Sequence, residues 1–225
     1  MANYLSRACN TWAKEGKLTN TVLHNLQSYI GSEHNGSTWM LFGLISAHVP
    51  CKDPGMVMDY FNTSIINPEG VGLYTLLQVL KVLFASVANL SEVDRSNLQS
   101  NLLSLVKKFK IPPELVSISI DVITVVSSLQ VDKENMKQYQ SSVDSWSVPI
   151  LETIDTHLSS VLLQAQSRSE VDEDLLSRQI FTLGELAQIC PHRINKRMFL
   201  LLQSIIFQSH DNIKVGSFPH SGLFL

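Results

Sequence analysis

The chain has 225 residues, of which 44% are hydrophobic and only 16% are charged, whereas charged residues make up roughly 25% of ordinary soluble proteins. A chain of this size can bury a substantial core, as one domain or as one piece of a larger array, and the low charge indicates that many of its faces meet protein rather than water. The net charge of -3 excludes a global attraction for nucleic acid or for an acidic membrane surface, so any DNA contact must be local.

The cysteines and the first residues indicate the compartment. The three cysteines are Cys9, Cys51 and Cys190. Because they are odd in number and widely spaced, a disulfide framework is not expected, and a reducing compartment is the simpler interpretation. Polar residues interrupt the first 17 positions, MANYLSRACNTWAKEGK, so no secretory signal is predicted there.

The first third of the chain is predicted to form pairs of helices. Residues 4–14 and 18–30 form a first pair, and the polar run SEHNGS after Gly31 forms a loop. Ser37 or Thr38 can cap a helix that runs to Val49 and ends at Pro50. A further helix over residues 55–62 follows Pro54, which suits the first turn of a helix.

Residues 71–89 form the longest apolar stretch, which is long enough to be considered as a membrane span. Lys81 lies at its centre, where insertion scales assign a cost of about 2.5 to 3.5 kcal/mol, and Gln78 and Ser86 interrupt it further. We therefore expect a buried helix of a soluble repeat and no membrane partner.

The middle of the chain is predicted to continue with four helices. Ser91 and Asp94 have the spacing of a cap before a helix that ends near Phe109. Residues 114–129 are rich in β-branched residues and could form a strand, but their length and the two preceding prolines favour a helix. A polar helix over 133–147 is expected to stop before Pro149, which starts a separate helix over 150–166.

The clearest unit is a helical hairpin over residues 172–208. Its first helix places Leu176, Ile180, Leu183, Ala187 and Cys190 on one stripe and stops at Pro191. The second helix, from Met198 onward, is apolar almost all round, so it is predicted to be buried on several sides. One hairpin cannot cover both helices, so a similar neighbour is expected to stack on it.

The spacing of Ser169 and Asp172 repeats the spacing of Ser91 and Asp94. It predicts a second serine cap at the start of the hairpin. The surrounding segment, 164–174, is the most polar connection in the chain.

These elements predict an all-α fold, an irregular α-solenoid of HEAT-like helical hairpins. Helices begin near residues 3, 37 and 71, which gives an early period of about 34 residues, and later spacings are longer. We expect residues 1–209 to form the repeat array. Residues 210–225 contain Gly216, Pro219 and Gly222 and lack a helical period, so a non-repetitive, disordered tail is expected.

The sequence offers little that indicates catalysis or a cofactor. The motifs GxxxxGK, GxSxG and HExxH do not occur. Gly70 and Gly72 begin a GxG without a preceding strand or a third glycine in place, and His34, His48 and Cys51 lack a fourth ligand for a metal. No enzyme activity, cofactor, metal or small-molecule substrate is therefore predicted. Cys190 is interpreted as a packing residue because it lies on the apolar stripe.

One local cluster favours an acidic partner. His192, Arg193, Lys196 and Arg197 lie between the two helices of the hairpin, and the last three are spaced to share one side of a helix start. Cations at the start of a helix are repelled by the positive end of the helix dipole, and a bound phosphate or carboxylate would offset this repulsion. The alternative is a solvated connector without a function. The four residues are the candidate contact for DNA or for an acidic partner.

The same hairpin resembles a known family. FTLGELAQICP followed by HRINKRMFLLLQSII, within residues 178–206, is similar to a segment of the HEAT-repeat, non-SMC D subunits of condensin II, and WMLFGLISAHVP at 39–50 is compatible with them. The resemblance implies a scaffold that binds kleisin and SMC subunits, and possibly DNA or chromatin, in the nucleus during mitotic chromosome condensation. The alternative is a HEAT- or armadillo-type scaffold for other protein partners, such as a transport receptor or a phosphatase regulatory subunit.

Overall fold

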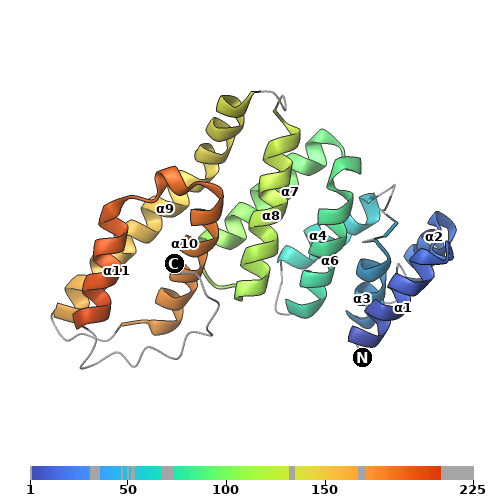
Figure 1. Ribbon diagram of the computed structural model, residues 1–225, viewed down its shortest axis with the longest axis horizontal. Coiled ribbons are helices and arrows are strands. Elements are labelled where there is room, and N and C mark those ends of the chain that lie inside the picture. The colour runs from blue at the N-terminus through green and yellow to red at the C-terminus, as the bar shows by residue number, and fades with distance from the viewer. Residues whose placement is uncertain are drawn as a thin grey trace. The chain divides into compact units, whose positions relative to one another are not determined.

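The computed structural model describes residues 2–30, 36–46, 48–49, 51, 54–66, 73–131, 135–166 and 171–208. Every regular element in these residues is a helix, which confirms the predicted all-α class (Figure 1). The chain divides into two compact units, Met1–Val143 and Asp144–Leu225. The expected tail at 210–225 lies outside the described residues, as does His34.

The helices are α1 (Ala2–Lys14), α2 (Asn20–Ile30), α3 (Gly36–Ser46), α4 (Gly55–Ile66), α6 (Leu73–Ser86), the 3₁₀ helix η1 (Val87–Asn89), α7 (Glu92–Lys107), α8 (Pro113–Leu129), α9 (Met136–Gln166), α10 (Glu173–Ile189), the 3₁₀ helix η2 (Pro191–Arg193) and α11 (Lys196–Gln208).

The first unit is a stack of helical pairs. The helix α3 packs against α1, α2 and α6, while α6 also packs against α4 and α8 (Figure 1). The pair α7 and α8 then stacks on α4 and α6, because α8 contacts α6 and α7 contacts α4. Each pair buries its apolar faces against the next pair, which is how a helical solenoid is stabilised.

The helix α6 forms the core of this unit. Leu76, Val79, Leu80 and Leu83 are fully buried in it, whereas Lys81 is exposed. The long apolar stretch is thus covered by neighbouring helices, as predicted. Among the described residues, none of the helices combines the length and the hydrophobicity that crossing a bilayer requires.

The ends of α7 and α8 follow the local sequence. The Ser91 hydroxyl accepts a hydrogen bond from the Asp94 N–H at 3.1 Å, so the predicted serine cap of α7 is confirmed. After α7, the buried Phe109 turns the chain with φ of 50°. Pro112 and Pro113 then start α8, and this β-branched segment is a helix, as predicted, rather than a strand. Its Ser119 and Ser127 hydroxyls donate to carbonyls four residues earlier.

The predicted break at Pro149 is wrong. One helix, α9, runs from Met136 to Gln166 with Pro149 inside it. A proline inside a helix loses one hydrogen bond and clashes with the preceding turn, at a cost of about 3 kcal/mol. Beyond it, Ile150, Ile154, Leu158 and Val161 are fully buried at helical spacing. Burying one such side chain stabilises by about 1.5 to 3 kcal/mol, so packing outweighs the local penalty.

Candidate partner-binding surface

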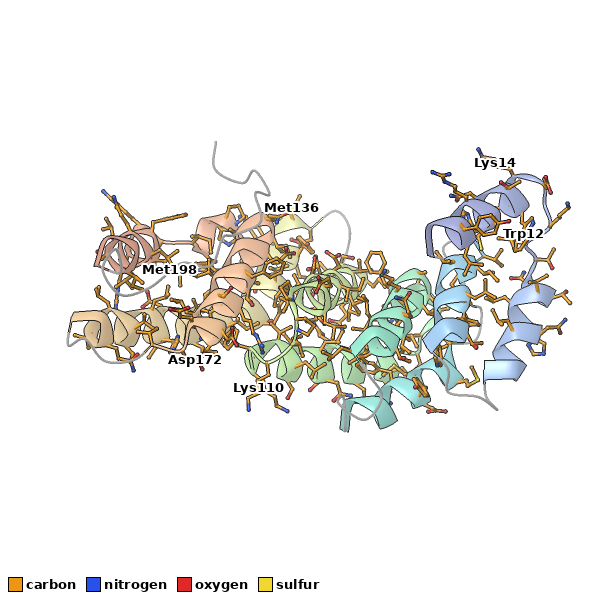
Figure 2. All side chains as sticks on the ribbon, turned by 90° about the horizontal axis from the view of Figure 1, so that it is seen from below. Trp12, Lys14, Lys110, Met136, Asp172 and Met198 are labelled. Carbon is orange, nitrogen blue, oxygen red and sulfur yellow. The ribbon has the colours of Figure 1, made fainter. Side chains whose placement is uncertain are left out.

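Short capping motifs set the geometry of the last hairpin. Asp172, labelled in Figure 2, caps α10 because its Oδ1 accepts a hydrogen bond from the Leu175 N–H at 2.9 Å. The predicted cap by Ser169 is therefore corrected: the carboxylate itself is the N-cap, and Ser169 lies outside the described residues. At the other end, Asn195 caps α11 by accepting from the Met198 N–H at 2.9 Å.

The turn between the two helices is tight and has an apolar base. Cys190 is fully buried at the end of α10, where its thiol donates to the Leu186 carbonyl at 3.1 Å. Burial raises the pKa of this thiol, so the reactive thiolate is disfavoured. Pro191 then begins η2, and this turn carries His192 and Arg193 on the surface. The interpretation of Cys190 as a packing residue agrees with this position.

Asp144 on α9 binds the first two candidate residues. Its Oδ1 lies 3.0 Å from Nε2 of His192, and its Oδ2 accepts a hydrogen bond from Nη2 of Arg193 at 2.5 Å. The hydrogen bond from Arg193 is the main reason why the pKa of Asp144 lies below its usual value. The Asp144 side chain is 17% exposed, against 47% for Arg193. This carboxylate therefore ties the turn to α9.

Arg197 reaches a second carboxylate on the same helix. Its Nη2 lies 3.5 Å from Oδ2 of Asp155 and donates to the Ser159 hydroxyl at 3.2 Å. The guanidinium side chain nevertheless stays 66% exposed. Lys196 is exposed and forms no ion pair within the described part of the chain. The structure thus separates the four predicted residues: His192 and Arg193 share Asp144, Arg197 faces Asp155, and Lys196 faces solvent.

Sequence reasoning missed both carboxylates, although a signal for them exists. Asp144 and Asp155 are 11 residues apart, which is about three helical turns and places them on the same side of one helix. The predicted break at Pro149 hid this relation, because two separate helices would not share a face. The actual helix α9 presents both acids to the segment 192–197. Much of the positive charge of the cluster is therefore balanced within the unit.

The helix α11 exposes large apolar side chains. Met198, labelled in Figure 2, and Ile205 are each 3% exposed and form the packed side. Phe199 and Leu200 are 52% and 51% exposed. Among the described residues, this helix is fully buried on its inner side only. The prediction that it is buried on several sides is therefore not met there.

No arrangement for a metal or for acid-base catalysis is evident in the described residues. No three side chains from His, Cys, Asp and Glu come together there in a way that could hold a metal ion. The shifted carboxyl pKa values are those of Asp144, which is engaged by His192 and Arg193, and Asp121, which is raised by burial. The exposed cations of η2 and α11 make this surface a candidate for binding an acidic macromolecule.

Comparisons with known proteins agree with the resemblance seen in the sequence. Residues 173–222 match the family described as condensin-2 complex subunit D3-like, HEAT repeats. The chain is 28% identical over 209 residues to the condensin-2 complex subunit D3-L of Xenopus laevis, and 27% identical over 209 residues to the condensin-2 complex subunit D3 of Mus musculus. These alignments cover 93% of this chain but 14% of each relative. No solved structure matches the chain. The predicted resemblance and the HEAT-like, all-α fold are confirmed.

Proposed function

We propose that this chain is a segment of a HEAT-repeat, non-SMC subunit of a condensin II complex and acts there as a non-catalytic scaffold. The extent of the similarity carries the proposal. An alignment of 209 residues is longer than the 143-residue first unit, so it includes helices of both compact units. Two unrelated helical hairpins can resemble each other by their apolar period alone, but that explanation does not extend to an alignment of this length.

The partners of such a scaffold would be the kleisin and SMC subunits of condensin II, on chromosomes in the nucleus during mitosis. Stacked helical pairs offer extended surfaces, and binding then depends on the shape and the side chains of those surfaces. The low charge content of the chain supports contact with protein over much of its surface.

Contact with DNA or chromatin is a narrower proposal. It rests on His192, Arg193, Lys196 and Arg197, which are exposed on one turn and the following helix. Asp144 engages the first two residues. The attraction for a phosphate therefore depends mainly on Lys196 and on the two-thirds exposed Arg197.

Affinity purification tests the scaffold proposal. The tagged protein, at its natural length, is purified from mitotic cell extract at moderate salt, and the bound proteins are identified by mass spectrometry. We expect stoichiometric recovery of kleisin and SMC subunits. Recovery of transport or phosphatase components in their place would refute the condensin assignment and would support the other solenoid scaffold.

Matched variants test the contribution of the cations. Lys196→Ala with Arg197→Ala removes the two accessible charges, and the control Arg193→Ala removes a charge that Asp144 already engages. If this surface contacts DNA, the double variant retains less DNA at 150 mM salt than Arg193→Ala does, while both keep the protein partners. Equal DNA retention in the wild type and the double variant would assign the contact to other residues.

A further inference from the structure

Two carboxylates of α9 approach their arginine partners in the same way. Oδ2 of Asp144 accepts a hydrogen bond from Nη2 of Arg193 at 2.5 Å, and Oδ2 of Asp155 lies 3.5 Å from Nη2 of Arg197. A guanidinium binds a phosphate through the same N–H groups with which it binds a carboxylate. Each carboxylate therefore takes up a donor that a phosphate of DNA would use.

The carboxylates lie on the inner side of this surface and the arginines on its outer side. The side chains of Asp144 and Asp155 are 17% and 19% exposed, against 47% for Arg193 and 66% for Arg197. A ligand that arrives from solvent meets the guanidinium groups first, with the opposite charges directly behind them. The Debye length is about 8 Å at physiological ionic strength, so a charge one guanidinium away is only partly screened.

A count of charges shows how far the carboxylates weaken the attraction for an anion. Arg193, Lys196 and Arg197 carry three positive charges, and Asp144 and Asp155 carry two negative charges, which leaves a net charge of one when the neighbouring histidine is neutral. Affinity for DNA grows with the number of phosphates that a protein neutralises. Most of the charge that this surface could offer to DNA is thus already balanced.

We propose that Asp144 and Asp155 form an autoinhibitory contact, in which their carboxylates bind Arg193 and Arg197 in place of phosphates and so weaken the contact of this surface with DNA. The inference rests on the DNA contact proposed above and names what limits it. Lys196, which forms no ion pair in the described residues, is then the cation that remains fully available.

The opposite effect, in which the carboxylates hold the arginines ready for a phosphate, is the weaker one. Holding an arginine still saves part of the side-chain entropy that binding costs. The saving is small for Arg197, because its side chain is 66% exposed and lies 3.5 Å from Asp155. The negative charge, by contrast, acts on every phosphate near the surface. We therefore expect removal of the carboxylates to strengthen DNA binding.

DNA binding by a variant with Asp144→Asn and Asp155→Asn tests the proposal. The tagged protein is purified at its natural length with the subunits that it retains, and its affinity for a short fluorescent DNA duplex is measured by anisotropy over a series of salt concentrations. The double variant is expected to bind about 3- to 10-fold more tightly than the wild type at physiological salt. Its affinity should also depend more steeply on salt, because more cations reach phosphates.

Two further variants identify the cause of the gain. Glu114→Gln with Glu152→Gln removes two exposed carboxylates that form no ion pair in the part of the chain that the structure describes, and it changes the net charge by the same amount. This control should bind DNA within about twofold of the wild type. Arg193→Ala with Arg197→Ala, added to the two asparagine substitutions, should abolish the gain.

Folding is checked separately from binding. Circular dichroism compares each variant with the wild type. The single variants Asp144→Asn and Asp155→Asn are measured as well, and each should give part of the gain, so the test does not depend on the stability of the double variant. A role of the carboxylates in stability alone would lower the affinity or leave it unchanged.

An unchanged affinity in the asparagine variants would overturn the inference, and a lower affinity would overturn it by showing that the carboxylates position the arginines. A gain that the glutamine control shares, or that survives removal of both arginines, would also overturn it, because the gain would then reflect overall charge. Failure of the proposed DNA contact has a different signature, which is equal DNA binding by the wild type and by Lys196→Ala with Arg197→Ala. Failure to recover kleisin and SMC subunits would refute the scaffold function and leave the binding comparison intact.

Discussion

Replacing Asp144 tests whether its carboxylate holds the α10–α11 turn against α9. In Asp144→Asn the helix propensity stays nearly the same, but the charge that Arg193 and His192 contact at 2.5 and 3.0 Å is removed. Hydrogen bonds to a charged group contribute about 1.5 to 3 kcal/mol when shielded, and exposed ion pairs contribute about 0.2 to 1 kcal/mol. Because the side chains of His192 and Arg193 are 38% and 47% exposed, we expect a loss of about 1 kcal/mol.

The measurement is urea unfolding of wild type and variant, followed by circular dichroism at pH 7 and low ionic strength. Glu152→Gln is the matched control, because it removes an exposed carboxylate from the same helix and is expected to change the free energy of unfolding by less than about 0.5 kcal/mol. Equal unfolding midpoints for the wild type and Asp144→Asn would contradict the role of Asp144.

The pH dependence gives a second check on the same carboxylate. The pKa of Asp144 is lowered in the folded chain, so its contribution is fully present above the unfolded value of about 3.9. That contribution is lost as the pH falls through the lower, folded value. The stability difference between wild type and Asp144→Asn should therefore be present at pH 5 and shrink below about pH 4. A difference that persists unchanged at pH 2 would show that the variant acts by a mechanism other than loss of the charge.

Three further substitutions or reactions test the fold. Pro149→Ala is expected to stabilise the chain by about 1 to 3 kcal/mol, because the proline is exposed inside α9 and alanine restores the helix hydrogen bond; a lower urea midpoint would argue against a continuous helix. Ser91→Ala removes the cap of α7 and should cost about 1 kcal/mol in the same assay, whereas an unchanged midpoint would show that the cap does not contribute. The three cysteines are buried, so a thiol reagent such as dithionitrobenzoate should modify them slowly in the native chain and rapidly in urea; fast native labelling would mean that these packing contacts open readily.

Most helix boundaries could be predicted because the signals for them are local. Ser91 and Pro113 mark the starts of α7 and α8 by hydrogen bonding and backbone geometry that involve neighbouring residues alone. The same reasoning failed at Pro149. The proline does cost helix stability locally, but α9 continues through it because the apolar side chains that follow are buried. Local reasoning also predicted Ser169 as the N-cap of α10, whereas Asp172 forms that cap. Serine and aspartate both favour the N-cap position, so the local signal does not distinguish them.

The candidate site was predictable in part. The cluster of His192, Arg193, Lys196 and Arg197 is visible in the sequence because the four residues are neighbours. Their partners are not visible in the same way, since Asp144 lies 48 residues before His192. An ion pair between such distant positions forms only when packing brings α9 against the turn.

The sequence by itself determined the all-α class and the helical pairs, because apolar period, caps and prolines act within a few residues. The resemblance to HEAT-repeat subunits was also visible in it, through the segment at residues 178–206. The tertiary structure alone decided three things. It made α9 continuous through Pro149, it placed Asp144 and Asp155 beside the basic cluster, and it left Phe199 and Leu200 exposed on α11. Each depends on which distant side chains share one environment, and burial and charge pairing are fixed only when the helices pack.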